Sequence, residues 1–175
     1  QILIHYGNLY GLKILSLRLF NVYGTKSRTS GTYGAMFGVF LKQKIKNYPL
    51  TVVGDGNQKR DFTYVSDVVA AFAKGLNYNC KEKILNIGTG KPIKVNTIVS
   101  ILKSKKIHIP KRPGEPSTTH ADISLVKREL GWKPKIGIEK GINLLLKDLN
   151  YWTKAPLWTT QKIKIATQDW FKFLK

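Results

Sequence analysis

The chain has 175 residues, 42% of them hydrophobic, and it carries a formal net charge of +20. A chain of this length and composition can bury a sizeable core, so we expect a globular protein and exclude an intrinsically disordered one. No stretch approaches the length of a membrane span, and no signal peptide is visible. The single cysteine, Cys80, excludes an internal disulfide framework and fits a reducing compartment, which predicts a cytoplasmic protein.

The high positive charge leaves open a basic module that binds nucleic acid or an anionic membrane. Lysine heavily outnumbers arginine, the basic residues are spread along the chain, and no acidic residue precedes Asp55. The sequence has no recognised nucleic-acid motif and no basic stripe interleaved with aromatic residues. We therefore interpret the charge as a solvated lysine surface. We expect neither a nucleic-acid nor a membrane partner, and an anionic small-molecule ligand is compatible with this charge.

The first third of the chain predicts a helix followed by a strand. Residues 1–10 have apolar side chains at helical spacing and are followed by Gly11, a residue typical of a helix C-terminus. Residues 13–20 form a nearly continuous apolar run, which predicts a buried strand that Asn21 closes. This order is half of a βαβ unit, so we expect the end of a doubly wound parallel sheet, and a helix over 36–45 follows. Ligands bind at the carboxyl ends of such strands, so Asn21 either contacts a ligand or makes a turn, and spacing alone does not separate these roles.

One central stretch combines a strand, a tight turn, an exposed arginine, a second strand and a helix. Residues 51–53 are β-branched, and residues 54–57 include two glycines that can adopt positive φ. Arg60 directly precedes the short apolar run 62–65, where a rigid edge can present its guanidinium to a carboxylate or a phosphate. Ser66 is expected to cap the helix that follows. The apolar face that this helix is expected to bury consists of Val68, Val69, Phe72 and Leu76.

The same patterns predict the remaining elements. These are strands over 84–87 and 107–109 and helices over 94–102, 123–130, 138–152 and 159–174. In the proline-bracketed loop 111–117, Arg112 and Glu115 either form a local surface ion pair or bind a diphosphate and a ribose hydroxyl, and the spacing alone favours the ion pair. The last helix is basic and amphipathic, so it lies on a membrane or docks on the domain. We favour docking, because its apolar face is narrow and Asp169 lies among its lysines.

Five motifs, taken together, resemble a known family. In chain order they are Leu17–Gly24 (LRLFNVYG), Gly54–Ala71 (GDGNQKRDFTYVSDVVAA), Asn86–Gly90 (NIGTG), Arg112–Pro116 (RPGEP) and Leu130–Pro134 (LGWKP). The chain resembles the C-terminal portion of the NAD-dependent epimerase/dehydratase family, the extended short-chain dehydrogenases of the UDP-glucose 4-epimerase type. Thr25 stands where this family usually has proline, a change that loosens the turn.

The resemblance implies an α/β fold, namely the C-terminal part of a Rossmann-type doubly wound parallel sheet plus a smaller α/β substrate-binding domain. Residues 1–24 would end the NAD-binding domain, and residues 66–90 would return to it as a helix and a strand. The substrate-binding domain would comprise residues 25–65 and 91–158. Residues 159–175 would form a C-terminal amphipathic helix.

The resemblance also implies a function and its site residues. Members of the family use tightly bound NAD for transient hydride transfer with the sugar of a nucleotide sugar, such as a UDP- or dTDP-sugar. The residues that match the family are expected to bind the diphosphate (Asn21, Arg60 and Arg112), the ribose (Glu115), the base (Thr51 and Val53) and the nicotinamide (Phe20). No metal ligand is implied.

The catalytic parts of the family pattern are absent from the chain. It contains neither the glycine fingerprint for NAD nor a Tyr-x-x-x-Lys pair, and we expect the pair upstream of Gln1. The chain is therefore predicted to be a fragment with the substrate-binding half, inactive alone, with exposed apolar surface and with NAD held mostly by the other half. The full-length protein is expected to be a homodimer. The alternatives are the basic binding module for nucleic acid or anionic membrane, and a sugar-nucleotide-binding relic without catalysis.

Overall fold

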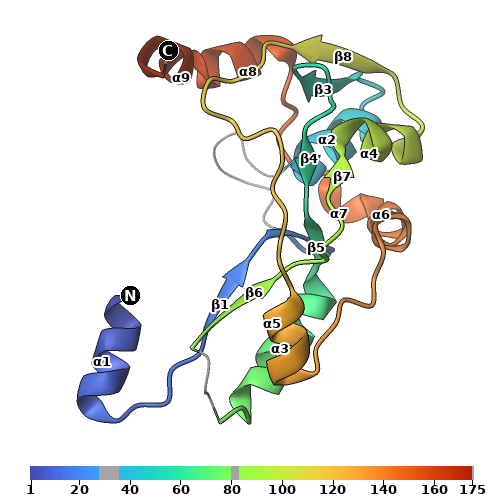
Figure 1. Cartoon of the computed structure of the whole chain (residues 1–175). Helices are drawn as coiled ribbons and strands as arrows, with labels where there is room; N and C mark the ends of the chain where they lie inside the picture. Colours follow the sequence, from blue (N-terminus) through green and yellow to red (C-terminus); the bar gives the residue numbers. More distant parts are fainter. Residues whose placement is uncertain (28–35, 80–82, 175) are drawn as a thin grey trace. The chain divides into compact units, whose positions relative to one another are not determined.

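The computed structural model describes residues 1–27, 36–79 and 83–174 (Figure 1). Cys80 lies outside this part of the chain. The chain divides into two compact units, each built from segments that are distant in sequence. Unit 1 comprises Gln1–Tyr23, Asp61–Pro92 and Thr119–Ile138, and unit 2 comprises Gly24–Arg60, Ile93–Thr118 and Glu139–Lys175. The functional domain boundaries expected from the sequence stay a prediction.

Unit 1 contains parallel strand pairs and helices, which confirms the predicted α/β class. Its elements are α1 (Ile2–Tyr10), β1 (Ser16–Leu19), β2 (Asn21–Tyr23), β5 (Phe62–Tyr64), α3 (Val65–Leu76), β6 (Ile84–Ile87) and α5 (Ser124–Leu130). β1 pairs with β6 in parallel, with Ser16 opposite Ile84, and β2 pairs with β5 in parallel, with Asn21 opposite Phe62. Parallel pairs need long crossover connections, and α3 lies within the connection from β1 to its partner β6.

The core of unit 1 forms where α3, β6 and the segment around α5 bury their apolar side chains. Its members are Val68, Ala71, Leu85, Ile87, Ala121, Ile123, Val126, Leu130 and Trp132. Alternation along β6 buries Leu85 and Ile87 on one face. The Trp132 indole Nε1 donates a hydrogen bond to the Asp67 carbonyl at 2.9 Å, so this large side chain is buried with its polar atom satisfied.

Much of the apolar face expected to be buried on α3 is instead exposed. Val68 and Ala71 enter the core, but Phe72 is 52% exposed and Leu76 is 86% exposed. Exposed apolar side chains also occur on α1 and β1, and include Ile2, Leu3, Leu9, Tyr10 and Leu19. The prediction that this chain exposes a large apolar surface is confirmed for the described residues.

Unit 2 combines short strands with most of the helices of the second half of the chain. Its elements are α2 (Met36–Ile45), β3 (Leu50–Val53), β4 (Lys59–Arg60), β7 (Ile93–Lys94), α4 (Val95–Leu102), β8 (Lys106–Ile109), α6 (Ile138–Lys147), α7 (Leu149–Trp152), α8 (Thr160–Ala166) and α9 (Gln168–Phe173). β3 pairs with β8 in parallel, whereas β4 pairs with β7 in antiparallel orientation. The buried side chains of α2, β3 and α4 form a common core and include Phe40, Leu41, Leu50, Val52, Ile98 and Leu102.

Several element boundaries differ from the prediction. α3 begins at Val65, so Ser66 lies within its first turn and is not its cap. Asn21 does not close β1 but begins β2, whose pairing partner β5 is distant in sequence. The helix expected over 138–152 is α6 and α7, separated at Asp148, and the tail helix is α8 and α9, separated at Thr167. Within the described ranges, no helix is long and apolar enough to cross a membrane.

Candidate functional site

The central feature of the predicted site is an ion pair between Arg60 and Glu115 in unit 2. Arg60 Nη2 donates to Glu115 Oε1 at 2.9 Å, and Arg60 Nη1 donates to the Lys59 carbonyl at 2.9 Å. Only 12% of the Arg60 side chain and 22% of the Glu115 side chain are exposed. The other carboxylate oxygen, Glu115 Oε2, is buried and has no hydrogen-bond partner among the described residues. A buried carboxylate oxygen without a partner is costly, so this oxygen is a feature of the pair that calls for an explanation.

Short strands hold the Arg60 backbone in place. In the β4–β7 pair, Lys59 lies opposite Lys94 and Arg60 lies opposite Ile93. Lys59 also forms a parallel bridge with Thr118, and its N–H donates to the Ser117 carbonyl at 2.8 Å. The guanidinium is therefore presented from paired backbone. The prediction that this arginine is exposed is wrong, because its side chain is largely buried in the pair with Glu115.

The loop that carries Arg112 and Glu115 is tied to the C-terminal helices. The Glu115 N–H donates to the Arg112 carbonyl at 3.4 Å, and Gly114 adopts φ 70°, a conformation that favours glycine. The Trp170 indole Nε1 donates to the Pro113 carbonyl at 3.0 Å, and the Arg112 guanidinium carbon lies 5.4 Å from the centre of a Trp170 ring. The local surface pair that spacing favoured for Glu115 is thus replaced by a partly buried pair with Arg60, 55 residues away.

The two residues expected beside the base lie on β3. Thr51 is buried, its N–H donates to Gln43 Oε1 at 3.1 Å, and its hydroxyl accepts from Gln43 Nε2 at 2.9 Å. Val53 is half-buried at the end of the strand, and its carbonyl accepts from Gln58 Nε2 at 3.0 Å. Gln43 therefore satisfies the polar groups of Thr51, a role that the sequence did not predict. Contact of either residue with a base stays a prediction.

Phe20 and Asn21 belong to unit 1. The Phe20 N–H donates to the Ile87 carbonyl at 3.0 Å, and its side chain packs against the unit 1 core. The Asn21 N–H donates to the Asp61 carbonyl at 3.0 Å, and Asn21 Oδ1 accepts from the Thr119 hydroxyl at 3.1 Å. These bonds hold the Asn21 backbone and fix the orientation of its side-chain amide. Contact of Phe20 and Asn21 with a ligand stays a prediction.

Asp61 is the residue of unit 1 whose role sequence reasoning missed. Its carboxylate is fully buried and accepts from the Thr89 N–H at 2.6 Å, the Thr89 hydroxyl at 2.6 Å, the Gly90 N–H at 2.9 Å and the Ala121 N–H at 3.0 Å. These bonds close the Gly88-Thr89-Gly90 turn against residue 121. The sequence did contain one indication of this role, because Asp61 directly precedes an apolar run. A carboxylate at such a position is expected to be buried, and a buried charge needs several hydrogen-bond donors.

Among the described residues, Tyr23 has a strongly shifted pKa. Burial, with further contributions from Tyr64 and Asp67, raises the pKa of Tyr23 well above its usual value, so its hydroxyl keeps its proton at neutral pH. No group of three His, Cys, Asp or Glu residues in ranges 1–27, 36–79 and 83–174 is placed to hold a metal ion.

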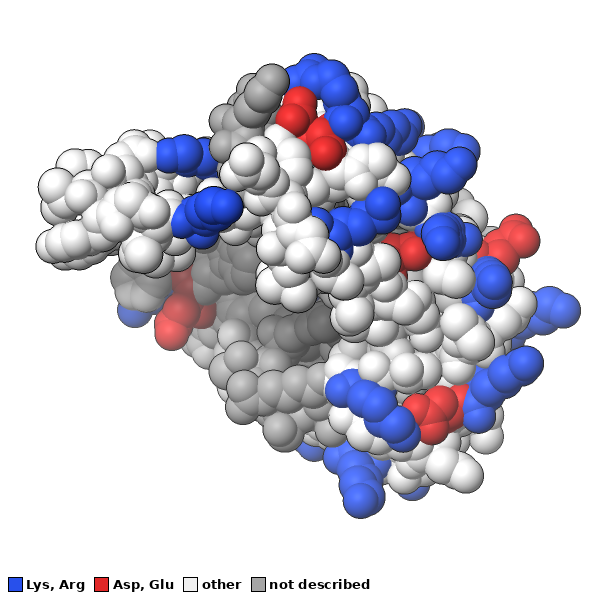
Figure 2. All heavy atoms as spheres, turned by 90° about the horizontal axis from the view of Figure 1, so that it is seen from below, with Lys and Arg blue, Asp and Glu red and all other residues white. Residues whose placement is uncertain are grey.

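The basic side chains are dispersed where they can be seen. On the face shown in Figure 2, Lys and Arg residues occupy many separate positions, with a few Asp and Glu residues among them. This distribution resembles a solvated surface more than the continuous basic stripe that tracks a nucleic-acid backbone.

Comparison with protein families gives one matching model. Residues 1–88 match the family described as "NAD dependent epimerase/dehydratase family". The match includes the strand pairs of unit 1, the Asn21 motif and the Arg60-Asp61 motif.

Individual proteins show the same similarity. A putative UDP-glucose 4-epimerase of Methanocaldococcus jannaschii is 39% identical over 143 residues, which cover 78% of this chain and 46% of that protein. The crystal structure of UDP-glucose 4-epimerase from Thermotoga maritima with UDP-glucose gives a TM-score of 0.77 at 31% identity, over 87% of this chain and 50% of that one. UDP-glucuronic acid 4-epimerase of Bacillus cereus, in complex with UDP-glucuronic acid and NAD, gives 0.72 at 29% identity, over 86% and 48%. The chain spans about half the length of the curated relatives it matches.

Proposed function

Because the chain belongs to the NAD-dependent epimerase/dehydratase family, we propose that it carries the nucleotide-sugar-binding part of an NDP-sugar epimerase or dehydratase. The observation that carries this proposal is the partly buried Arg60–Glu115 pair with its unpartnered carboxylate oxygen. A nucleoside diphosphate sugar offers a dianionic diphosphate and a ribose with two hydroxyls next to each other. The pair matches this combination of an anion and hydrogen-bond donors.

Arg60 is proposed to bind the diphosphate. Its two hydrogen bonds to the described residues leave further N–H groups of the guanidinium for phosphate oxygens. Its carboxylate partner and the paired backbone fix the orientation of the guanidinium before the ligand arrives, which lowers the entropic cost of binding. Bonds between an arginine and a phosphate are charge-assisted and belong to the stronger class of hydrogen bonds.

Glu115 is proposed to accept from a ribose hydroxyl through Oε2. That oxygen is removed from water, so a ligand hydroxyl would satisfy an atom that otherwise lacks a partner. Arg112, in the same loop, is proposed as a second diphosphate ligand, which requires its guanidinium to serve the ligand as well as the Trp170 ring. Asn21, Thr51 and Val53 complete the proposed substrate residues.

NAD is proposed as the cofactor of the whole protein, held mostly by its other half, with Phe20 as the residue of this chain expected at the nicotinamide. The sequence has no Gly-x-x-Gly-x-x-Gly fingerprint and no Tyr-x-x-x-Lys pair, and Phe20 packs on the unit 1 core. NAD, when bound, would accept a hydride from the sugar ring and return it. Within this chain we assign only substrate binding and no catalytic residue. A homodimer is proposed for the full-length protein.

The proposal is tested by titrating the full-length protein with UDP-glucose, UDP-glucuronic acid and dTDP-glucose in a calorimeter. Arg60→Gln should weaken the binding of the preferred ligand about 10- to 100-fold, since a charge-assisted bond is lost. Arg128→Gln is the matched control, because Arg128 Nε also pairs with a glutamate, Glu129, at 2.9 Å but its side chain is 67% exposed. Glu115→Gln combined with Arg60→Gln removes the uncompensated carboxylate and shows whether the loss of affinity needs that charge.

Unchanged affinity in Arg60→Gln with an unchanged melting temperature would refute the assigned role of Arg60. Absence of nucleotide-sugar binding together with salt-sensitive binding to DNA would favour the basic binding module instead. Product analysis separates the two reaction classes, because epimerisation conserves the mass of the sugar nucleotide and dehydration removes one water.

A further inference from the structure

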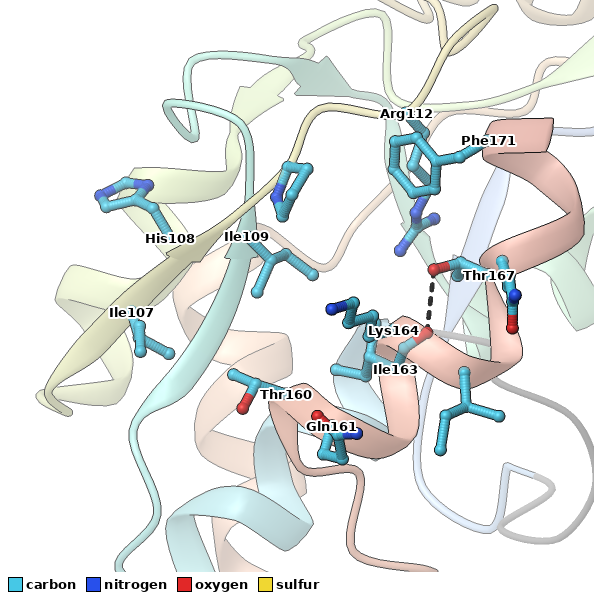
Figure 3. A pocket seen from close by; sticks show the side chains of 13 residues that line it. Ile107, His108, Ile109, Arg112, Thr160, Gln161, Ile163, Lys164, Thr167 and Phe171 are labelled. Carbon is cyan, nitrogen blue, oxygen red and sulfur yellow. Dashed lines mark hydrogen bonds between the residues drawn. The ribbon is translucent and has the colours of Figure 1, made fainter.

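A second binding feature lies in unit 2 between β8 and the C-terminal helices. It is a cavity of about 830 Å³, within the size range of small-molecule sites (Figure 3). β8 and the residues directly after it form one wall, and α8 and α9 form the other. The proposed nucleotide-sugar residues other than Arg112 do not line this cavity among the described residues.

The wall made by the C-terminal helices is well defined. The Thr159 hydroxyl accepts from the Lys162 N–H at 3.3 Å and caps α8, while Ile163 is buried beneath the helix. Thr167, which separates α8 from α9, is also buried, and its hydroxyl donates to the Ile163 carbonyl at 2.8 Å. This bond stabilises the bend between the helices, and the bend brings Phe171 to the cavity (Figure 3).

The lining combines an apolar interior with two cations. Its apolar part includes Ile107, Ile109, Pro110, Ile163, Ile165 and Phe171. In Figure 3, Arg112 enters from the loop after β8 and Lys164 enters from α8. The described lining contains no Asp or Glu, in a chain that has ten of them. The lining also contains the polar side chains of His108, Thr160, Gln161, Thr167 and Gln168. Positive charge without a carboxylate favours an anionic head group, and the apolar side chains favour a ligand that carries an apolar body.

We propose that this cavity binds a small amphiphilic anion, with a carboxylate or phosphate head group at Arg112 and Lys164 and an aliphatic or aromatic body against Ile109 and Phe171. The bidentate donors of Arg112 suit either head group, and Lys164 adds a mobile point charge. The proposal does not require the nucleotide-sugar function. Because Arg112 lines this cavity, a bound ligand would nevertheless engage the guanidinium that the proposed function assigns to a diphosphate.

The test titrates the full-length protein with octyl phosphate and with octanoate, both below their micelle-forming concentrations. Octanol and inorganic phosphate serve as separate probes for the body and the head group. Saturable binding of one octyl anion per chain is expected, with octanol and inorganic phosphate each about tenfold weaker or more. The ratio between octyl phosphate and octanoate identifies the preferred head group.

Lys164→Glu should weaken binding of the octyl anion about five- to tenfold, because it places a negative charge at the head group. Lys162→Glu is the matched control, since this exposed lysine makes the same charge change on α8 but lies outside the cavity lining. Phe171→Ala should weaken the binding of octyl phosphate but not that of inorganic phosphate, because only octyl phosphate has an apolar body to place against Phe171. Equal effects of Lys164→Glu and Lys162→Glu, or no saturable binding, would overturn the proposal.

Arg60→Gln separates this proposal from the proposed function. Octyl phosphate binding should be unchanged in Arg60→Gln, whereas nucleotide-sugar binding should be unchanged in Lys164→Glu. If Arg60→Gln abolishes the binding of octyl phosphate and Lys164→Glu leaves it unchanged, the probe occupies the nucleotide-sugar site and the cavity proposal is wrong.

Discussion

Replacement of Asp61 by alanine should destabilise the protein more than any other loss of a single acidic side chain discussed above. The substitution removes the acceptor of the Thr89, Gly90 and Ala121 N–H groups, all bonded at 3.0 Å or less. Each buried donor left without an acceptor costs about 1–3 kcal/mol. Water that enters the vacated space would recover part of this, so we expect a total loss of roughly 3–5 kcal/mol in the free energy of unfolding. Domains of this size have only about 5–15 kcal/mol in total.

Urea denaturation followed by circular dichroism measures this loss. Asp61→Asn should fall between the parent and Asp61→Ala, because its amide keeps one carbonyl acceptor but turns an NH₂ group towards the remaining donors. Asp55→Ala is the control, since Asp55 is exposed and its carboxylate accepts from the N–H and the side-chain amide of the neighbouring Asn57. A midpoint of Asp61→Ala equal to that of Asp55→Ala would show that the four bonds do not stabilise the fold, and the assigned role of Asp61 would be wrong.

Two further predictions concern the same unit. Gly88→Ala should lower the melting temperature, because the new Cβ would lie 2.2 Å from the Ala121 Cβ and force a shift that costs about 1–3 kcal/mol. Gly137→Ala is the control and should have little effect, since no atom lies within 4 Å of its new Cβ. Hydrogen bonds from the Ser124 hydroxyl and N–H hold the pKa of Asp122 below its usual value. Its contribution to stability is therefore fully present above the unfolded-state pKa near 4 and is lost as the pH falls through the lower folded-state pKa. Asp122→Asn should therefore lose less stability than the parent protein as the pH falls, which urea denaturation at several values from pH 7 to pH 2.5 measures. An equal dependence of stability on pH in the variant and the parent would show that the reasoning is wrong.

Local sequence patterns were sufficient where an element depends on its own residues. α2 spans Met36–Ile45 and β6 spans Ile84–Ile87, as predicted, since helical spacing and a continuous apolar run are local signals. The helical pattern of the tail continues through Thr167, but the buried hydroxyl of this residue accompanies a break between α8 and α9. β2 was missed because its three residues become a strand only by pairing with β5, about 40 residues later.

The residues of the candidate site also differ in how far local sequence predicts their roles. Arg60 stands out in sequence as an arginine before an apolar strand, but the sequence predicted an exposed side chain, whereas only 12% of it is exposed. Its partnership with Glu115 was not predictable, because the nearer arginine in sequence is Arg112 and the true pairing depends on how β4 meets the loop after β8. The roles of Asp61 and Gln43 likewise depend on donors and acceptors supplied by other segments. Residue type identified candidates for the site, and tertiary contacts decided their partners.

The alternation of the chain between its two units has a consequence for how such a protein can arise and be engineered. The backbone passes from one unit to the other after Tyr23, Arg60, Pro92, Thr118 and Ile138. No single cut therefore releases either unit as a continuous polypeptide, and a one-point recombination between Gly24 and Ile138 with a distant homologue would leave both units hybrid. Each unit folds only when three segments that are distant in sequence come together, which costs loop-closure entropy. The last segment of each unit is synthesised after segments of the other unit, so neither unit can complete its fold first from one continuous stretch. Exchange of one whole unit with that of a homologue therefore requires recombination at all five of these crossings.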